Sequence, residues 1–257
     1  MDLENELKKY GIITKMQVEN IKKWLSTFYI YAANENMPKN KRYEYTVSNI
    51  TRGKILAVEF GYGVQSEFRN FHYCVALHDS PKKNPKVTVV PITSKKHPHQ
   101  IPIGYELADR LENIVRDYEH SHFWQPYRDL AKKYANFPDI QFTFPAVGSY
   151  GSVFPTCTAH IEKLKAQILA IQNNKLSPLI TELDKILKSL ILFDQFYKAS
   201  PNLQKYSYLR VEDITTISKA RIINPKNTNH PLYKLRLSNE SLDKLDKEII
   251  RRFTLSK

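Results

Sequence analysis

The chain has 257 residues, of which 42% are hydrophobic, and its formal net charge is +13 at pH 7. This length and composition suit a globular protein with one large domain or two small ones. The positive charge favours nucleic acids or acidic proteins as partners, although a solvated lysine surface gives the same total. Two cysteines, Cys74 and Cys157, exclude a disulfide framework. The sequence shows no signal peptide and no apolar run of membrane-spanning length, so we expect a cytoplasmic protein.

The N-terminal region, residues 1–50, predicts one helix followed by a linker. Thr14 and Gln17 have the spacing of a capping box at the start of a helix over residues 14–33. The apolar positions that follow lie three or four residues apart, as on one buried helical face: Val18, Ile21, Leu25 and Phe28. Residues 34–50 are rich in asparagine and basic residues, which favours a linker.

Three strands are expected next, over residues 54–60, 72–78 and 86–92. Each segment is rich in β-branched and aromatic residues, and glycine or proline interrupts the chain between them. Cys74 falls inside the second segment, where we expect it to be a small core residue.

The pattern becomes helical within residues 105–205. One apolar helical face comprises Leu107, Leu111, Ile114, Val115 and Tyr118. Two later series alternate three and four residues apart, as in a seam between packed helices: Ile161, Leu164, Ile168 and Ile171, then Leu179, Leu183, Ile186, Leu190 and Phe193. The turn residues between the two series predict an antiparallel helical hairpin. Residues 136–156, rich in proline and aromatic residues, are expected to be irregular.

The C-terminal region is expected to return to a strand and end in a helix. Residues 206–212 have strand character. The final helix is expected over residues 238–253, where Ser238 or Asn239 can serve as the N-cap.

The order of short motifs in two separate blocks resembles the PemK/MazF family of toxin endoribonucleases. The first block, residues 51–104, holds Arg52-Gly-Lys-Ile55, a loop with Ser66-Glu67 and a strand that ends in Pro91-Ile-Thr-Ser94. The second block, residues 206–257, holds a strand, the closing helix and, between them, Ile217-Ser-Lys-Ala-Arg-Ile222. Single tetrapeptides are not specific here, so the resemblance rests on the order and spacing of the motifs.

The resemblance implies an α+β protein built on a small, mostly antiparallel SH3-like β-barrel. This barrel would be discontinuous in sequence, formed by residues 51–104 and 206–257. Residues 105–205 would be a mostly helical insertion that contains the hairpin. The N-terminal helix and linker would be an addition to the family fold.

Toxins of this family cut single-stranded RNA without a metal or another cofactor. The ribose 2′-OH attacks its own phosphodiester and leaves a 2′,3′-cyclic phosphate and a 5′-OH. This chemistry needs a base for the 2′-OH, an acid for the leaving oxygen and donors that stabilise the phosphorane. The resemblance thus implies a sequence-selective endoribonuclease that acts as the toxin of a toxin–antitoxin or phage-defence system. It also implies an antitoxin as partner and a homodimer.

The resemblance assigns catalytic roles to four residues. His72 replaces a family arginine and can act as an acid or a base, or simply pack at the start of a strand. Thr93 can donate to a phosphate oxygen or cap the end of its strand. Arg210 and Glu212 match the family's acid–base pair, Arg-x-Asp, or form a cross-strand salt bridge. On one strand, residues two apart would point into the same groove.

The residues expected to contact RNA are Ser66, Glu67, Arg69, Ser94 and Thr215. Arg69 can supply the guanidinium that His72 lacks, or it can be an exposed loop arginine. Glu67 can equally serve the fold of its loop. Thr215 stands where the family has a second arginine.

Other functions remain open on the sequence alone. Loss of the family arginines at His72 and Thr215 favours a non-catalytic binding protein on the same fold, as in the related gyrase poisons. Binding of nucleic acid without cleavage is a third possibility. Arg210, Glu212 and Thr93 favour the enzyme.

Two further patterns are weaker signals. His97-Pro-His99 and His120-Ser-His122 lack a third ligand at the spacing of a metal site, so no metal is predicted. The aromatic residues within 123–134 are interleaved with basic residues. They can stack RNA bases or belong to a helical core.

Overall fold

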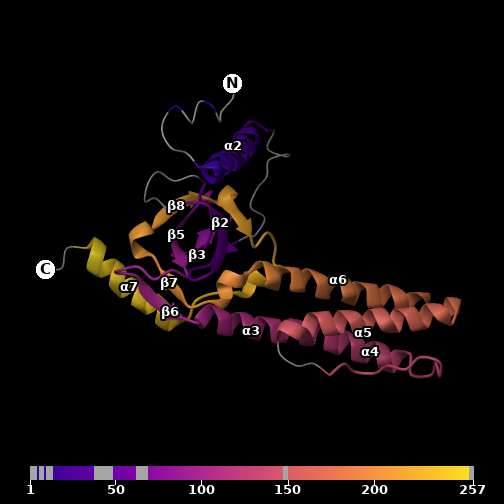
Figure 1. The fold of residues 1–257 in the computed structure, drawn as a ribbon. Coiled ribbons are helices and arrows are strands. Elements are labelled where there is room, and N and C mark those ends of the chain that lie inside the picture. Colours follow the sequence, from indigo (N-terminus) through magenta and orange to yellow (C-terminus); the bar gives the residue numbers. More distant parts are fainter. Residues whose placement is uncertain are drawn as a thin grey trace. The chain divides into compact units, whose positions relative to one another are not determined.

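A computed structural model describes residues 14–37, 49–61, 69–146 and 150–254, together with Asn5 and Lys9. The chain divides into two compact units (Figure 1). The first combines residues 1–103 with 207–257, and the second comprises residues 104–206. The first unit is therefore discontinuous in sequence. Among the described residues, no helix is both long enough and apolar enough to cross a membrane.

The first unit is built on an antiparallel sheet. Its strands are β2 (Ile55–Glu59), β3 (Phe71–Ala76), β5 (Lys86–Thr93), β6 (Ile101–Gly104), β7 (Ser207–Leu209), β8 (Thr215–Ser218) and β9 (Ile222–Asn224). They follow one another in the order β6-β7-β5-β3-β2-β9, and β8 also pairs with β5. A short separate pair joins β1 (Asn49–Ile50) to β4 (Ser80–Pro81). The protein is thus α+β, as predicted, while closure of the sheet into an SH3-like barrel stays a prediction.

One core cluster of the first unit lies on one face of this sheet. Its buried residues are Ile50, Leu56, Val58, Cys74, Ala76, Val87, Val89, Ile217 and Ile222. Alternate residues of each strand point inward, as the two-residue period of a strand requires. Cys74 is fully buried, and burial raises the pKa of its thiol well above the ordinary value. The central strands were predictable because their segments are rich in β-branched and aromatic residues and are separated by glycine or proline.

Helix α7 (Asn239–Phe253) closes the first unit at its C-terminus. The Ser238 hydroxyl accepts a hydrogen bond of 3.1 Å from the Ser241 amide, so Ser238 is the N-cap. Leu242 and Leu245 are buried and anchor the helix by its apolar side. This helix and its cap agree with the prediction.

Helix α2 (Lys15–Asn36) forms the N-terminal element of the described chain. Val18 is buried, but Phe28, expected on the same face, is 50% exposed. The expectation was wrong because Phe28 stacks on Trp24 at a ring separation of 5.6 Å. The Gln17 side chain and most of the linker lie outside the described residues.

The second unit is helical. Its elements are α3 (Glu106–Glu119), the π-helical turn η2 (His120–Trp124), α4 (Gln125–Lys133), α5 (Tyr150–Ala170), the 3₁₀ turn η3 (Asn174–Leu176) and α6 (Ser177–Ala199). Helices α5 and α6 lie side by side, which agrees with the predicted hairpin (Figure 1). The expectation that residues 136–156 are irregular was wrong from Tyr150 onward. The reason is burial of Val153, Phe154 and Cys157 on one helical face.

The aromatic cluster of η2 and α4 belongs mainly to the core. Phe123 and Tyr127 are completely buried, and Tyr134 is nearly so. The Tyr127 hydroxyl bonds to the carbonyl of Thr143 and to the His160 ring, each at 2.9 Å. Of the two interpretations of this cluster, these rings support core packing.

Glu119 is a buried acid at the end of α3. It is only 8% exposed, and its Oε1 has no hydrogen-bond partner among the described residues. Burial raises its pKa from 4.5 to about 7, against the opposing effect of Arg116. A carboxyl whose pKa is raised by folding contributes stability below about pH 4.5, and this stability is lost as the pH rises through 7.

Replacing Glu119 with glutamine should therefore stabilise the helical unit in a pH-dependent way. At pH 8 we expect a gain of about 2–3 kcal/mol, because the neutral amide avoids the buried charge. Near pH 4.5 the gain should be small. Thermal unfolding at both pH values measures the difference, with the exposed Glu162→Gln as control. An equal gain at both pH values would show that charge burial is not the cause.

Candidate functional site

His72 and Thr93 lie on neighbouring strands of the first unit, β3 and β5. On β3, His72 pairs with Val58 of β2, so it lies on the inward face at the end of the core row. Cys74 pairs with Pro91 on β5. Continuing this antiparallel register by two residues places His72 opposite Thr93. Opposite residues of paired strands point to the same face, so on this register His72 and Thr93 belong to the same face of the sheet.

The environment of His72 lowers the pKa of its imidazole. Partial burial is the main cause that lowers the pKa below the ordinary value of 6.5, and the charge of Arg210 lowers it further. Hydrogen bonds to the backbone of Ile92 and Arg69 oppose this shift. In a neutral ring one nitrogen donates while the other keeps its lone pair, which is the form of a base.

Arg210 follows directly after β7. Tyr208 pairs with Thr93, and the Arg210 amide donates to the Pro91 carbonyl at 3.0 Å. The chain then leaves the sheet and forms the 3₁₀ turn η5 (Val211–Asp213). The expected strand over residues 206–212 therefore ends early. Burial of Val211 in this turn is the physical reason.

Arg210 and Glu212 form an ion pair within this turn, not along or across a strand. The distance from Arg210 Nε to Glu212 Oε1 is 3.5 Å. The argument that both residues share one strand face was thus wrong, although the turn still brings them together. Their side chains are 23% and 34% exposed, so both remain accessible to solvent.

Asp213 is a closer partner of Arg210 and was missed by the sequence analysis. Its Oδ2 lies 2.5 Å from Arg210 Nε, and its side chain is only 17% exposed. Burial is the largest cause that raises the pKa of Asp213, Glu212 adds to it, and Arg210 opposes it. The available signal was the three-residue spacing, which brings side chains together only in a helical turn.

Arg252 reaches the same site from α7 and was also missed. Its Nη1 lies 3.6 Å from Glu212 Oε2, and its Nε lies 2.5 Å from Glu248 Oε1. It also donates to the His99 carbonyl in the loop after β5. Glu212 therefore lies between the guanidinium groups of Arg210 and Arg252.

The remaining predicted residues have separate positions. The Thr93 hydroxyl accepts a hydrogen bond of 3.1 Å from the Lys95 amide, so it caps the strand but keeps its own proton to donate. Arg69 and Ser94 are exposed. Thr215 pairs with Val89, four residues from Thr93 along β5, or about 13 Å. The structure does not join it to the cluster.

Ser66 and Glu67 lie outside the described residues, so their expected contacts with RNA stay predictions. Within the described ranges, the His, Cys, Asp and Glu side chains form no group of three that could hold a metal ion. The candidate site therefore consists of the His72 imidazole, the Thr93 hydroxyl and two arginines that are paired with carboxylates, Arg210 and Arg252.

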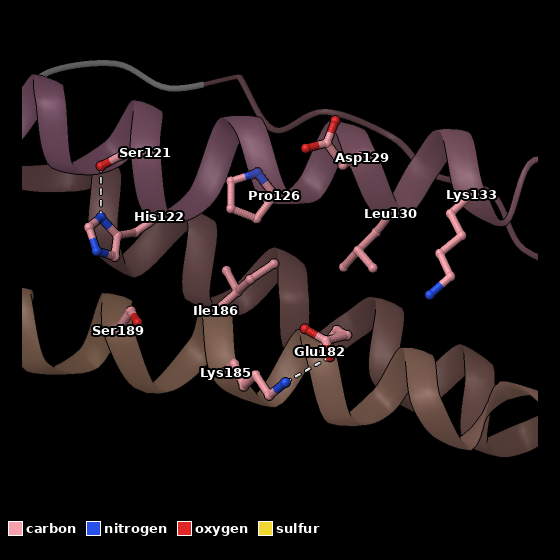
Figure 2. Close-up of a pocket in the computed structure, with 10 residues that line it drawn as sticks. All are labelled: Ser121, His122, Pro126, Asp129, Leu130, Lys133, Glu182, Lys185, Ile186 and Ser189. Atoms are coloured by element: carbon pink, nitrogen blue, oxygen red, sulfur yellow. Dashed lines mark hydrogen bonds and ion pairs between the residues drawn. The ribbon is translucent and has the colours of Figure 1, made fainter.

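A pocket of about 410 Å³ lies in the helical unit, between the η2–α4 segment and α6 (Figure 2). There the Ser121 hydroxyl and His122 Nδ1 are 2.8 Å apart, as in a nucleophile–base pair. The hydroxyl, however, bonds back to the Asp117 carbonyl at 2.8 Å, a common arrangement for a helical serine. The Asp129 carboxylate accepts a hydrogen bond from Gln125 of its own helix. The pocket is thus a weaker candidate than the cluster around His72.

The charges around this pocket are mixed, so they do not favour binding of a polyanion. Its lining contains Asp129 and Glu182 as well as Lys133 and Lys185. Lys185 is paired with Glu182 at 2.8 Å on the same helix (Figure 2). The pocket holds no residue that the sequence analysis assigned to a site.

Comparison with known proteins does not extend the functional assignment. No family model matches the chain, and no curated protein sequence matches it. The likeness to PemK/MazF toxins therefore rests on the sequence motifs and stays a prediction. The functional argument depends on the geometry of the cluster formed by His72, Thr93, Arg210, Glu212 and Asp213.

Proposed function

We propose that this protein is a metal-independent endoribonuclease that cuts single-stranded RNA by attack of the ribose 2′-OH. The observation that best supports this function is a partly buried imidazole whose pKa is lowered by burial and by the charge of Arg210. A base and a cation at one phosphate are what the reaction requires. The net charge of +13 supports binding of a polyanion.

Each group of the site has a role in this reaction. His72 takes the proton of the 2′-OH as the new 2′-oxygen–phosphorus bond forms. Arg210 stabilises the charge that develops on the phosphorane, and the Thr93 hydroxyl donates to a phosphate oxygen. Glu212 is assigned the role of the acid that protonates the 5′ oxygen as its bond to phosphorus breaks. The products are a 2′,3′-cyclic phosphate and a 5′-OH.

The pH dependence of cleavage tests the role of His72. A base must be deprotonated, and the pKa of His72 is lowered from 6.5, so kcat/KM should reach its plateau on the alkaline side of a pKa below 6.5. On the acid side, activity should fall as the pH drops through that lower value, whereas a descending limb at higher pH would belong to the group that donates the proton. His72→Ala should remove this ascending limb together with most of the activity. An ascending limb that persists in His72→Ala would assign the base to another group.

The cellular role follows the family resemblance. The enzyme would act in the cytoplasm as the toxin of a toxin–antitoxin or phage-defence system, as a homodimer controlled by an antitoxin. The motifs of residues 51–104 and 206–257 are the support for this role.

A second candidate is a nucleic-acid or protein binder that cuts nothing. One observation favours it: Arg210 and Arg252 are already paired with carboxylates, as in a structural ion-pair network. This function predicts that RNA shifts in a gel but stays intact.

A further inference from the structure

We infer that Arg252 is a positioning residue, which holds Glu212 and the loop after β5 in place from the C-terminal helix. The inference rests on the proposed function, because Glu212 and Thr93 are assigned there to the reaction. Arg252 is assigned no contact with RNA. Its effect would pass entirely through the groups that it holds.

The contacts of Arg252 join three elements of the first unit. Its guanidinium pairs with Glu212 of η5 at 3.6 Å and with Glu248 of α7 at 2.5 Å. It also donates to the main-chain carbonyl of His99. The side chain is only 17% exposed, so water screens these contacts weakly. One arginine therefore couples the turn that carries Glu212 to the loop and to the helix.

The loop held by Arg252 begins directly after Thr93. The Thr93 hydroxyl accepts from the Lys95 amide, and the Gln100 side chain accepts from the His97 amide at 3.1 Å. His99 has φ of +66°, a left-handed conformation that costs a residue with a Cβ about 1 kcal/mol. The hydrogen bond from Arg252 to the His99 carbonyl helps to hold this turn. Arg252 thus supports both Glu212 and the chain that leaves Thr93.

Helix α7, which carries Arg252, is itself anchored in the first unit. Its N-terminus is capped by Ser238, and Leu242 and Leu245 are buried. Lysine could keep the charge of Arg252 but could not reach three acceptors at once, because it lacks the planar fork of a guanidinium. Arg252→Lys should therefore behave like Arg252→Gln.

Arg251 offers a matched control on the same helix. It also pairs with Glu248, at 2.6 Å, but its side chain is 65% exposed. Both Arg251→Gln and Arg252→Gln remove one positive charge next to Glu248. A simple effect of charge or of helix stability would appear in both variants, whereas positioning of Glu212 should appear only in the second.

RNA cleavage kinetics supply the main test. Arg252→Gln should lower kcat by about 10-fold, with a smaller change in KM, because a displaced catalytic group slows the chemical step. Arg251→Gln should leave kcat near that of the wild type. In a Glu212→Gln background, Arg252→Gln should cause little further loss. The same loss in both backgrounds, or from both arginines, would overturn the inference.

Hydrogen exchange separates this inference from the proposed function. Arg252→Gln should accelerate amide exchange in residues 95–100 and 211–213, and Arg251→Gln should not. This measurement is informative even if the wild-type protein cuts no RNA. Absence of cleavage would end the proposed function, while unchanged exchange in Arg252→Gln would end the inference.

Discussion

Replacing Arg210 with alanine should reduce kcat for RNA cleavage by about 10²–10³-fold, the usual cost of removing one donor that stabilises an oxyanion. The positive charge of Arg210 lowers the pKa of His72. The Arg210 Nε lies 2.5 Å from Asp213 Oδ2. This contact fixes the guanidinium on one side. The proposed reaction uses its remaining N–H groups toward the phosphate.

Single-turnover kinetics with a short RNA measure this loss directly, and Arg251→Ala is the control for removal of one positive charge. Arg210→Lys should recover little activity, because an ammonium cannot pair with Asp213 and bind a phosphate in the same geometry. The variant leaves the Asp213 carboxylate without its cation, so its unfolding midpoint must be compared with that of the wild type. Wild-type kcat in a folded Arg210→Ala protein would remove Arg210 from the mechanism.

Replacing Gly61 with alanine should destabilise the first unit by about 2–4 kcal/mol, through overpacking and backbone strain. Gly61 has φ of +82°, and a Cβ there would lie 2.3 Å from Nε1 of Trp24. The indole would have to move, which would loosen the packing of α2 near this glycine. Gly61 also bonds across the hairpin, because its carbonyl accepts from the Asn70 amide at 2.7 Å. The strain would therefore act at the entrance to β3, which carries His72.

Gly104→Ala is the matched control for this substitution. Gly104 also has a positive φ, +64°, but the nearest atom to a new Cβ is Tyr206 Cε2 at 4.0 Å. Gly104→Ala should lower the unfolding free energy by only about 1 kcal/mol, the cost of a left-handed backbone conformation for a residue with a Cβ. Trp24→Ala should restore part of the stability of Gly61→Ala, because it removes the clash. Denaturant unfolding measures the stability of the wild type, Gly61→Ala, Gly104→Ala and the double variant Trp24→Ala/Gly61→Ala. An equal loss of unfolding free energy in the two glycine variants would show that a clash with Trp24 is not the cause.

Local sequence pattern predicted the longer elements well and the shorter strands poorly. The strands around Leu56, Cys74 and Val89 are rich in β-branched and aromatic residues, and the seams of α5 and α6 repeat at helical spacing. Strands β6, β8 and β9 were missed because their pairing, not their composition, makes them strands. Thr215–Ser218, for example, was not among the predicted strands, yet it pairs along the first half of β5.

The candidate site was predictable in its residues but not in its contacts. The motif resemblance named His72, Thr93, Arg210 and Glu212. Of these, the structure pairs Arg210 with Glu212, and His72 and Thr93 lie on the neighbouring strands β3 and β5. The end of β7 at Leu209 depends on burial of the following valine, which a local pattern does not reveal. The contacts of Asp213 and Arg252 depend on that turn and on the packing of α7, so the sequence could not supply them.

The most direct test is incubation of the purified protein with a long single-stranded RNA in EDTA. His72→Ala and Glu212→Ala are assayed beside the wild type. The proposed function predicts discrete fragments with 5′-OH ends, produced by the wild type and lost in both variants. Intact RNA that still shifts in a gel with the wild-type protein would contradict it and would favour the binding protein.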